Sequence, residues 1–256
     1  MMNTASDSPL VSVITPTYFA ERFIGQTIDS VLAQTYSNWE MIITDDASKD
    51  GTINIIKKYE EDDSRIKLVA LETNHGAAHA RNISLQQARG RFIAFLDSDD
   101  MWFPEKLEIQ LYEMLRRSWA FSFTSYITVD ENGNDIDRTI QAPKQLSYAD
   151  MLKHNDIGCL TVMIDQQQTG ERYMKPIKAR QDYVLWLELA KSGFPAYGIN
   201  RPLAKYRELT KSLSSNKLEM AKLNWRVYRE VEELSLIKSL YYFSHFAVNK
   251  LTKYSS

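Results

Sequence analysis

Short apolar runs alternate with helically spaced apolar positions over the first hundred residues of the chain. The runs predict four strands, at residues 10–15, 40–44, 66–71 and 92–96. Apolar positions three or four residues apart predict helices at 21–35, 51–61 and 77–88. Pro16 would end the first strand, and Ser48 would cap the second helix. This alternation is typical of a doubly wound α/β fold, with a mostly parallel central sheet flanked by helices.

The pattern changes in the second half of the chain. It predicts helices at 104–117, 147–153 and 181–191, the last ending at Gly193, and strands at 120–129, 136–141 and 158–165. The segment Asp130-Glu131-Asn132-Gly133 favours a hairpin with a type I′ turn. No linker rich in Pro, Gly or Ser divides this region. We therefore expect one domain at residues 1–214, followed by a helical segment at residues 215–256.

The C-terminal segment has its own composition. From Leu236 to Leu251, ten of sixteen residues are apolar or tyrosine, and no acidic residue follows Glu233, whereas Lys238 and Lys250 are basic. A basic amphipathic helix of this kind is typical of a helix that lies on a membrane surface. The alternatives are a helix that packs on the domain, or on a second copy of the chain in a homodimer.

Composition excludes several classes of protein. Hydrophobic residues make up 44% of the chain, charged residues 25%, and the net charge is −2, so no general basic field would attract nucleic acid. The single cysteine, Cys159, excludes an internal disulfide and fits a reducing cytosol. No basic leader and no long apolar stretch is present, so we expect a cytoplasmic protein without a signal peptide or transmembrane helix.

Three carboxylates follow the fourth predicted strand: Asp97, Asp99 and Asp100. Ligands of α/β sheets bind beyond the carboxyl ends of the strands. A Mg²⁺ or Mn²⁺ ion, held by one or two carboxylates and by substrate phosphates, would relieve the repulsion in this cluster. The alternative is a solvated turn in which one of these side chains caps the helix near Pro104.

Asp45 and Asp46 end the second predicted strand, at the same edge of the sheet as Asp97 and Asp99. One acidic group could bind a base or ribose while the other holds a metal that bridges two phosphates. Together they indicate a nucleoside-diphosphate site. The alternative is ordinary turn chemistry, because strand ends are rich in aspartate.

Two arginines could neutralise the diphosphate of such a ligand. Arg81 lies on the helix after Gly76, and Arg207 follows the last predicted helix in a flexible segment. Asp182 begins the helix at 181–191, where it is either a simple cap or a general base that faces an acceptor hydroxyl. Trp102, Trp186 and Gly158 are candidates for a sugar-binding platform, or else are packing residues of the core.

The motifs in combination resemble family 2 glycosyltransferases of the GT-A fold, a Rossmann-like architecture. The resemblance runs from Val11 to about Ser214. It rests on five segments: Val11–Tyr18, Ser30–Tyr36, Asp45–Asp50, Gly76 with Ala80–Asn82, and Phe95–Asp100, followed by Gln181-Asp182 and Trp186. Ala47 and Lys49 depart from the usual Asp-Asp-Gly-Ser-Thr-Asp, and Gln181 replaces the usual Glu. The whole chain is most similar to the teichuronic acid biosynthesis type of bacterial polysaccharide glycosyltransferase.

This resemblance implies an inverting, metal-dependent transfer of a hexose-type sugar. In such a reaction Asp182 is the base and Asp99 the metal ligand, with support from Asp97. Pro16, Thr17, Tyr18 and Asp46 would bind the base and ribose of a UDP-sugar donor. The acceptor would be a glycan on a polyprenyl diphosphate at the inner face of the cytoplasmic membrane, in the synthesis of teichuronic acid, capsule or O-antigen.

Other functions remain to be weighed. Haloacid-dehalogenase phosphatases place Asp-X-Asp after their first strand rather than their fourth, and nucleotidyltransferases carry a glycine-rich basic loop that Pro16-Thr17-Tyr18 does not match. Dinucleotide oxidoreductases need Gly-X-Gly-X-X-Gly, which follows no strand here. The non-enzymatic alternative is an inactive GT-A module that binds a nucleotide sugar or acts as a scaffold.

Overall fold

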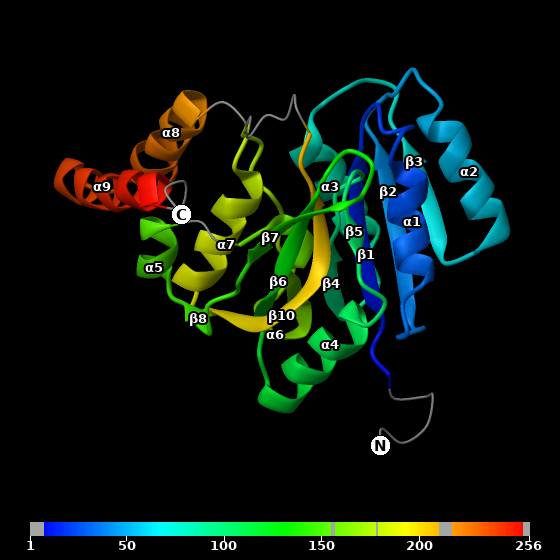
Figure 1. Ribbon diagram of the computed structural model, residues 1–256, viewed down its shortest axis with the longest axis horizontal. Coiled ribbons are helices and arrows are strands. Elements are labelled where there is room, and N and C mark those ends of the chain that lie inside the picture. The colour runs from blue at the N-terminus through cyan, green and yellow to red at the C-terminus, as the bar shows by residue number, and fades with distance from the viewer. Residues whose placement is uncertain (1–7, 155–156, 178, 210–216, 253–256) are drawn as a thin grey trace.

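The computed structural model describes residues 8–154, 157–177, 179–209 and 217–252. In this part of the chain, ten strands form one sheet with helices on both faces (Figure 1). The first four strands in chain order are β1 (Val11–Thr17), β2 (Trp39–Asp45), β3 (Ile66–Ala70) and β4 (Phe92–Phe95). The remaining strands are β5 (Met101–Trp102), β6 (Phe121–Val129), β7 (Asp135–Ile140), β8 (Gln145–Leu146), β9 (Met163–Asp165) and β10 (Ala196–Arg207).

The strand order is β3-β2-β1-β4-β9-β6-β10-β5, with β7 on β6 and β8 on β10. Pairing is parallel among β1, β2, β3 and β4, as the alternating pattern predicts. The second half is mixed, because β9 is antiparallel to both β4 and β6, while β10 is parallel to β6. Strand β4, which leads into the Asp97–Asp100 segment, thus has a parallel neighbour on one side only.

The helices cover the sheet in two layers. Their bounds are α1 (Ile24–Leu32), α2 (Thr52–Asp62), α3 (Ala77–Gln87), α4 (Lys106–Arg117), α5 (Tyr148–Lys153), α6 (Gln166–Thr169), α7 (Gln181–Lys191), α8 (Lys217–Arg226) and α9 (Leu236–Thr252). Along β4, Phe92 and Ala94 pack with α1, α2 and α4, whereas Ile93 and Phe95 pack with α3, α5 and α7. Alternate residues of each strand therefore supply the two hydrophobic cores.

Three local predictions at turns and helix ends are wrong. Strand β1 continues through Pro16 to Thr17. Ser48 does not cap α2; Asp50 Oδ1 accepts the Thr52 N–H instead, at 3.1 Å. The β6–β7 turn is not type I′, because only Gly133 of its central pair has a positive φ, 87°. Asp130 explains the difference, since its Oδ1 accepts two backbone N–H groups of the turn and fixes another conformation.

Two longer segments also differ from the prediction. Residues 158–165 were expected as one strand, but a 3₁₀ turn at Cys159–Thr161 (η1) precedes β9. The twelve-residue strand β10 was not predicted. Its sequence contains Pro202 and Gly198, and its pairing with β6 shifts register around Pro202.

The C-terminal segment packs on the domain through α5 and α7 (Figure 1). A π-helical turn, Val227–Val231 (η3), joins α8 to the loop before α9, and Val227 and Tyr228 are buried in the core that contains Trp186. Glu232 accepts a hydrogen bond from Tyr148 Oη at 2.6 Å and forms an ion pair with Lys191 at 3.1 Å. The predicted boundary at 214/215 lies outside the described residues.

The opposite face of α9 is open. Its exposed large apolar residues are Leu236, Ile237, Leu240, Tyr241 and Val248. None of the helices among the described residues is both long and apolar enough to cross a bilayer. The segment therefore combines a face packed on the domain with an uncovered apolar stripe.

Candidate active site

The carboxyl ends of β1, β2 and β4 meet at one edge of the sheet, where most of the predicted site residues lie. Thr17 is opposite Asp45 in the register of β1 and β2, and Ile14 is opposite Phe95 in that of β1 and β4. The Asp97–Asp100 segment follows directly after β4. This arrangement is the ligand-binding edge of an open α/β sheet.

Asp45 organises the loop after β2. Its carboxylate accepts hydrogen bonds from Thr17 Oγ1 at 2.8 Å and from Ser48 N and Oγ at 2.8 and 2.6 Å. Ser48 Oγ in turn accepts the Phe19 N–H at 2.9 Å. Asp45 is 0% exposed and Thr17 2%. The predicted direct contact of Thr17 and Asp45 with a donor does not fit this structure, because their side chains have almost no free surface. Instead they brace the loop after β2.

Asp46 joins this loop to the loop after β3. Its Oδ1 accepts the His75 N–H at 2.8 Å, and its Oδ2 accepts the Gly76 N–H at 2.7 Å. Gly76 has φ 89° and ψ 162°, a conformation that only glycine adopts readily. Pro16 is buried beneath, whereas Tyr18 is 51% exposed at the rim. Among Pro16, Thr17 and Tyr18, which were predicted to bind the base, Tyr18, just after β1, is thus the one available to stack on it.

Arg81 and Asp97 form an ion pair across the site. Arg81 lies on α3 and is 7% exposed, while 31% of the Asp97 side chain is accessible. Burial favours the neutral form of Arg81, but the carboxylates of Asp97 and Asp182 outweigh burial and raise its pKa. The charges of Asp97 and Asp182 thus both act on Arg81.

Asp99 and Asp100 complete the acidic cluster. Burial, and next the charge of Asp97, raise the pKa of Asp99 to about 6. Asp100 is 1% exposed and its Oδ1 accepts the Arg207 N–H at 2.9 Å, so its side chain supports the fold. Burial raises the pKa of Asp100 as well. No cage of three His, Cys, Asp or Glu side chains forms within the described ranges.

The acidic cluster nevertheless fits a hard divalent cation. Mg²⁺ and Mn²⁺ need only one or two carboxylates when substrate phosphates and water complete the coordination. Asp99 is partly accessible; burial is the main cause of its raised pKa and the charge of Asp97 the next, and a cation would offset both by favouring the ionised carboxylate. The alternative reading as a helix cap is not observed, because the N-cap of α4 is Glu105 and no side chain caps it.

Arg207 is not flexible, and this part of its prediction is wrong. It is the last residue of β10, 2% exposed, and its guanidinium stacks on Phe23. Its Nε donates to Asp99 O at 2.8 Å, and its Nη1 donates to Glu131 O at 2.7 Å. Burial lowers its pKa. Arg207 therefore fixes the backbone of the acidic loop and does not extend toward a ligand.

Asp182 lies in the first turn of α7, where it is partly buried. The helix forms because its next residues bury an almost continuous apolar surface, listed as Tyr183, Val184, Leu185, Trp186, Leu187 and Leu189. Arg180 precedes the helix with φ 70°, a strained left-handed conformation for a non-glycine residue. Asp182 is thereby held close to Arg81 and to the buried thiol of Cys159, whose pKa is raised by burial.

Two predicted acceptor contacts are wrong because the residues belong to the core. Trp102 is 3% exposed and donates from Nε1 to Leu160 O at 2.7 Å. Trp186 is 0% exposed and packs between Phe95 and Phe121. The alternative reading as packing residues is correct for both.

Gly158 is partly exposed, and its contact with an acceptor stays a prediction. A Cβ at this position would lie 3.0 Å from Leu160 Cδ2 and 3.2 Å from Tyr126 Cε1. Tight packing is therefore one sufficient reason for glycine here.

The prediction from sequence missed the roles of two polar residues. Asn82 forms reciprocal hydrogen bonds with the backbone of Met174, at 2.8 and 2.7 Å, and so links α3 to the segment before α7. Arg180 flanks Asp182, and its buried Nε has no hydrogen-bond partner among the described residues. From sequence alone, a single Asn or Arg looks like an ordinary surface residue. The only signal that these two have a role was their position next to Arg81 and close to Asp182.

Comparison with known proteins agrees with this geometry. The model of the family described as Glycosyl transferase family 2 matches residues 12–175. The fold and the site define a glycosyltransferase of the GT-A fold, and the chain belongs to glycosyl transferase family 2.

Two relatives are similar over nearly their whole length. The teichuronic acid biosynthesis glycosyltransferase TuaG of Bacillus subtilis is 53% identical, over 96% of this chain and 97% of its own. The Escherichia coli protein WfgD, named a UDP-Glc:alpha-D-GlcNAc-diphosphoundecaprenol beta-1,3-glucosyltransferase, is 41% identical, over 97% of this chain and 96% of its own. The C-terminal segment is thus part of the shared chain.

Solved structures support the fold alone. TarS 1–349 of S. aureus in complex with UDP-GlcNAc has a TM-score of 0.68 at 20% identity, over 93% of this chain and 71% of that one. The mannosyltransferase PcManGT of Pyrobaculum calidifontis, in complex with GDP-Man and Mn²⁺, has a TM-score of 0.69 at 17% identity, over 90% and 66%.

Proposed function

We propose that the protein transfers a hexose-type sugar from a UDP-sugar to a hydroxyl of a glycan on a polyprenyl diphosphate, with inversion, in bacterial surface polysaccharide synthesis. The observation that carries the proposal is the Arg81–Asp97 ion pair beside Asp99 after the carboxyl end of β4, with the charge of Asp182 on α7 acting on the same arginine. The names of the relatives TuaG and WfgD support the donor and acceptor classes.

The donor lies across the ends of β1, β2 and β4 in this proposal. Tyr18 stacks on the base, and the loops braced by Asp45 and Asp46 enclose the ribose. Asp99 would hold a Mg²⁺ or Mn²⁺ ion together with the diphosphate, Asp97 would support that ion, and Arg81 adds positive charge. When bound, the cation neutralises charge that builds on the leaving diphosphate.

Asp182 acts as the general base. It takes the proton from the acceptor hydroxyl while that oxygen forms a bond to the anomeric carbon, and the bond from that carbon to the UDP oxygen breaks on the opposite face. A single displacement of this kind inverts the anomeric configuration. A positioned base contributes roughly 10²–10⁴-fold to the rate.

The acceptor's lipid would keep the enzyme at the inner face of the cytoplasmic membrane. The exposed stripe of α9, and its two lysines without an acidic residue, support a peripheral attachment there. The other face of α9 already packs against the hydrophobic core of the domain. A homodimer through the same stripe is the competing arrangement.

Three variants test the proposal. Asp182→Asn should lose transfer by about 10²-fold or more while it keeps metal-dependent UDP binding. Asp99→Asn should lose metal-dependent UDP binding, and Asp62→Asn on the exposed face of α2 is the matched control. Transfer by Asp182→Asn at the parental rate would overturn the assignment of the base.

The inactive-module alternative is separated by donor hydrolysis. Purified protein with Mn²⁺ and a series of UDP-sugars should release UDP slowly without acceptor, and this release should stop in chelator. Nucleotide binding without hydrolysis or transfer, for every donor and acceptor offered, would favour the inactive module.

A further inference from the structure

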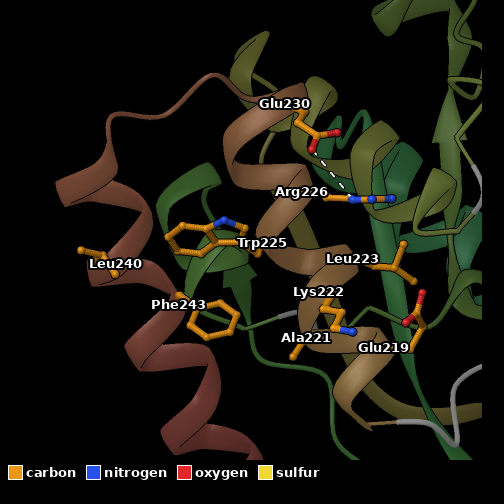
Figure 2. Close-up of a pocket in the computed structure, with 9 residues that line it drawn as sticks. All are labelled: Glu219, Ala221, Lys222, Leu223, Trp225, Arg226, Glu230, Leu240 and Phe243. Atoms are coloured by element: carbon orange, nitrogen blue, oxygen red, sulfur yellow. Dashed lines mark ion pairs between the residues drawn. The ribbon is translucent and has the colours of Figure 1, made fainter.

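The helix pair α8–α9 carries an open groove of about 690 Å³ that the proposed chemistry does not use (Figure 2). Five apolar side chains line it, together with four charged ones on α8 and η3; the apolar ones are Ala221, Leu223, Trp225, Leu240 and Phe243, and the charged ones Glu219, Lys222, Arg226 and Glu230. In Figure 2, Trp225 and Phe243 lie between the two helices and face each other. Their ring centroids are 5.5 Å apart in an edge-to-face contact. The groove therefore combines an apolar side, which holds the Trp225–Phe243 aromatic pair, with charged side chains of α8 and η3.

A track of ring contacts leads from this groove to the proposed base. Phe243 contacts Phe246 with ring centroids 6.1 Å apart, and the guanidinium of Arg180 lies 6.0 Å from the Phe246 ring. Arg180 is two residues before Asp182, whose charge acts on it. From the groove inward the order is thus the open groove, the buried ring of Phe246, the Arg180 cation and then the proposed general base.

Arg180 itself is unusual in two ways. Its φ of 70° is strained for a residue with a Cβ, and such strain gathers at functional sites. Its Nε is buried, and among the described residues no atom accepts a hydrogen bond from it. A guanidinium in this state suits a phosphate oxygen, which it binds through two parallel N–H groups.

We propose that the α8–α9 groove binds the polyprenyl chain of the acceptor and that Arg180 binds its diphosphate. The class of acceptor rests on the proposed function. The three chemical parts of a polyprenyl-diphosphate glycan match three places in order: the chain in the groove, the diphosphate at Arg180 past the Phe246 ring, and the sugar hydroxyl at Asp182. The exposed stripe of α9 lies alongside, where a lipid would enter from a bilayer.

Binding of soluble prenyl diphosphates tests the groove without any need for transfer. The full chain, with UDP and Mn²⁺ present to occupy the donor site, is titrated calorimetrically with inorganic, geranyl and farnesyl diphosphate. The affinity should rise with chain length. Leu240→Ser should weaken farnesyl diphosphate about threefold to tenfold and leave inorganic diphosphate unchanged. Ile237→Ser is the matched control, because Ile237 is exposed on α9 but does not line the groove.

The head group is tested separately. Arg180→Gln should weaken the binding of all three diphosphates by about tenfold and leave the ratios of their affinities unchanged. Arg180→Lys should keep part of the affinity. Circular dichroism and thermal unfolding of each variant show whether it is folded.

Three results would overturn the proposal. The first is equal binding of geranyl and farnesyl diphosphate by the parent chain. The second is an equal effect of Leu240→Ser and Ile237→Ser. The third is a dimer in light scattering that Leu240→Ser dissociates, because the groove would then hold a second copy of the chain. Failure of sugar transfer alone would contradict the proposed function and leave the binding result intact.

Discussion

Ala47 holds a left-handed backbone conformation, φ 66°, in the loop that Asp45 braces. Glycine is the usual residue at the corresponding place of the Asp-Asp-Gly-Ser motif. Relief of the strain should offset the lost methyl group and the added chain entropy, so Ala47→Gly should leave the free energy of unfolding unchanged or raise it by up to about 1 kcal/mol. Ala221→Gly, inside α8, should lower it by about 1 kcal/mol. Urea unfolding of both variants checks the sign, and an equal loss would contradict the assigned strain.

Glu40, near the amino end of β2 and so at the sheet edge opposite the site, gives the fold a pH-dependent interaction. It is 2% exposed, and its carboxylate accepts hydrogen bonds from Ser12 Oγ at 2.8 Å and from Arg89 Nε and Nη2 at 3.0 and 2.8 Å. Burial acts to raise its pKa, but these hydrogen bonds prevail and the pKa is lowered below 4.5. The ionised side chain therefore stabilises the fold above about pH 4.5, and this contribution is lost as the pH falls through the lowered pKa.

The measurable consequence is a substitution effect that depends on pH. Glu40→Gln should lower the free energy of unfolding by about 1–3 kcal/mol at pH 7 and by less at pH 3. Glu61→Gln, exposed on α2, should change it little at either pH. Denaturant unfolding at the two pH values makes the comparison; a constant effect of Glu40→Gln would show that packing, not charge, matters at this site.

At the scale of single residues, the sequence predicted where the site residues lie better than it predicted how exposed their side chains are. Asp45, Asp97 and Asp99 could be placed because the carboxyl ends of parallel strands share one edge. The buried states of Trp102, Trp186 and Arg207 could not be predicted, because each depends on packing against segments far away in the chain, such as Leu160, Phe121 and Glu131. An aromatic or cationic residue beside a motif is equally compatible with a ligand and with a core.

At the scale of elements, α3 connects the donor side of the site to the acceptor side. Arg81 pairs with Asp97, and the next residue, Asn82, holds the Met174 backbone in the segment before α7. Loss of both hydrogen bonds should cost about 2 kcal/mol of stability. Because that segment leads to Asp182, we expect Asn82→Ala to lower kcat for transfer while UDP binding is kept.

The conservative variant separates positioning from simple stability. Asn82→Asp keeps the acceptor for Met174 N–H and loses the donor to its carbonyl, so it should recover part of kcat. Gln86→Ala, exposed on the same helix, is the control. If UDP affinity and kcat fall in parallel in Asn82→Ala, the residue supports the fold as a whole rather than α7.

Elements were predictable where local pattern and local chemistry agree. The helix at Gln181–Lys191 is observed at the predicted bounds, with Gly193 at φ 93° just after its end. Strand β10 was not predictable, because its pairing with β6, rather than its own composition, makes it a strand. The β6–β7 turn likewise follows the Asp130 side chain rather than the Asn-Gly pair.

At the scale of the whole molecule, the C-terminal segment has two faces with different partners. In Figure 1, α8 and α9 lie at the end of the molecule that also holds α5 and α7, away from α1 and α2. Tyr228 and Phe246 are buried toward the domain, whereas Ile237 is 82% exposed. Amphipathic spacing predicted the helix, but it could not predict that its two apolar sides would be divided between a core and an open surface.

The open side yields the last prediction, on attachment to a bilayer. The full chain should bind vesicles that contain phosphatidylglycerol more tightly than neutral vesicles, because α9 adds Lys238 to an apolar stripe. Ile237→Ser should weaken this binding about tenfold, and Lys238→Gln about fivefold on the anionic vesicles only. Ile136→Ser, at an exposed position of β7, should have no effect. Cosedimentation measures all three, and indifference to Ile237→Ser would contradict a membrane role for this face. Since Ile237 does not line the α8–α9 groove, a variant that loses vesicles yet keeps farnesyl diphosphate would show that the chain reaches the bilayer with one surface and its lipid substrate with another.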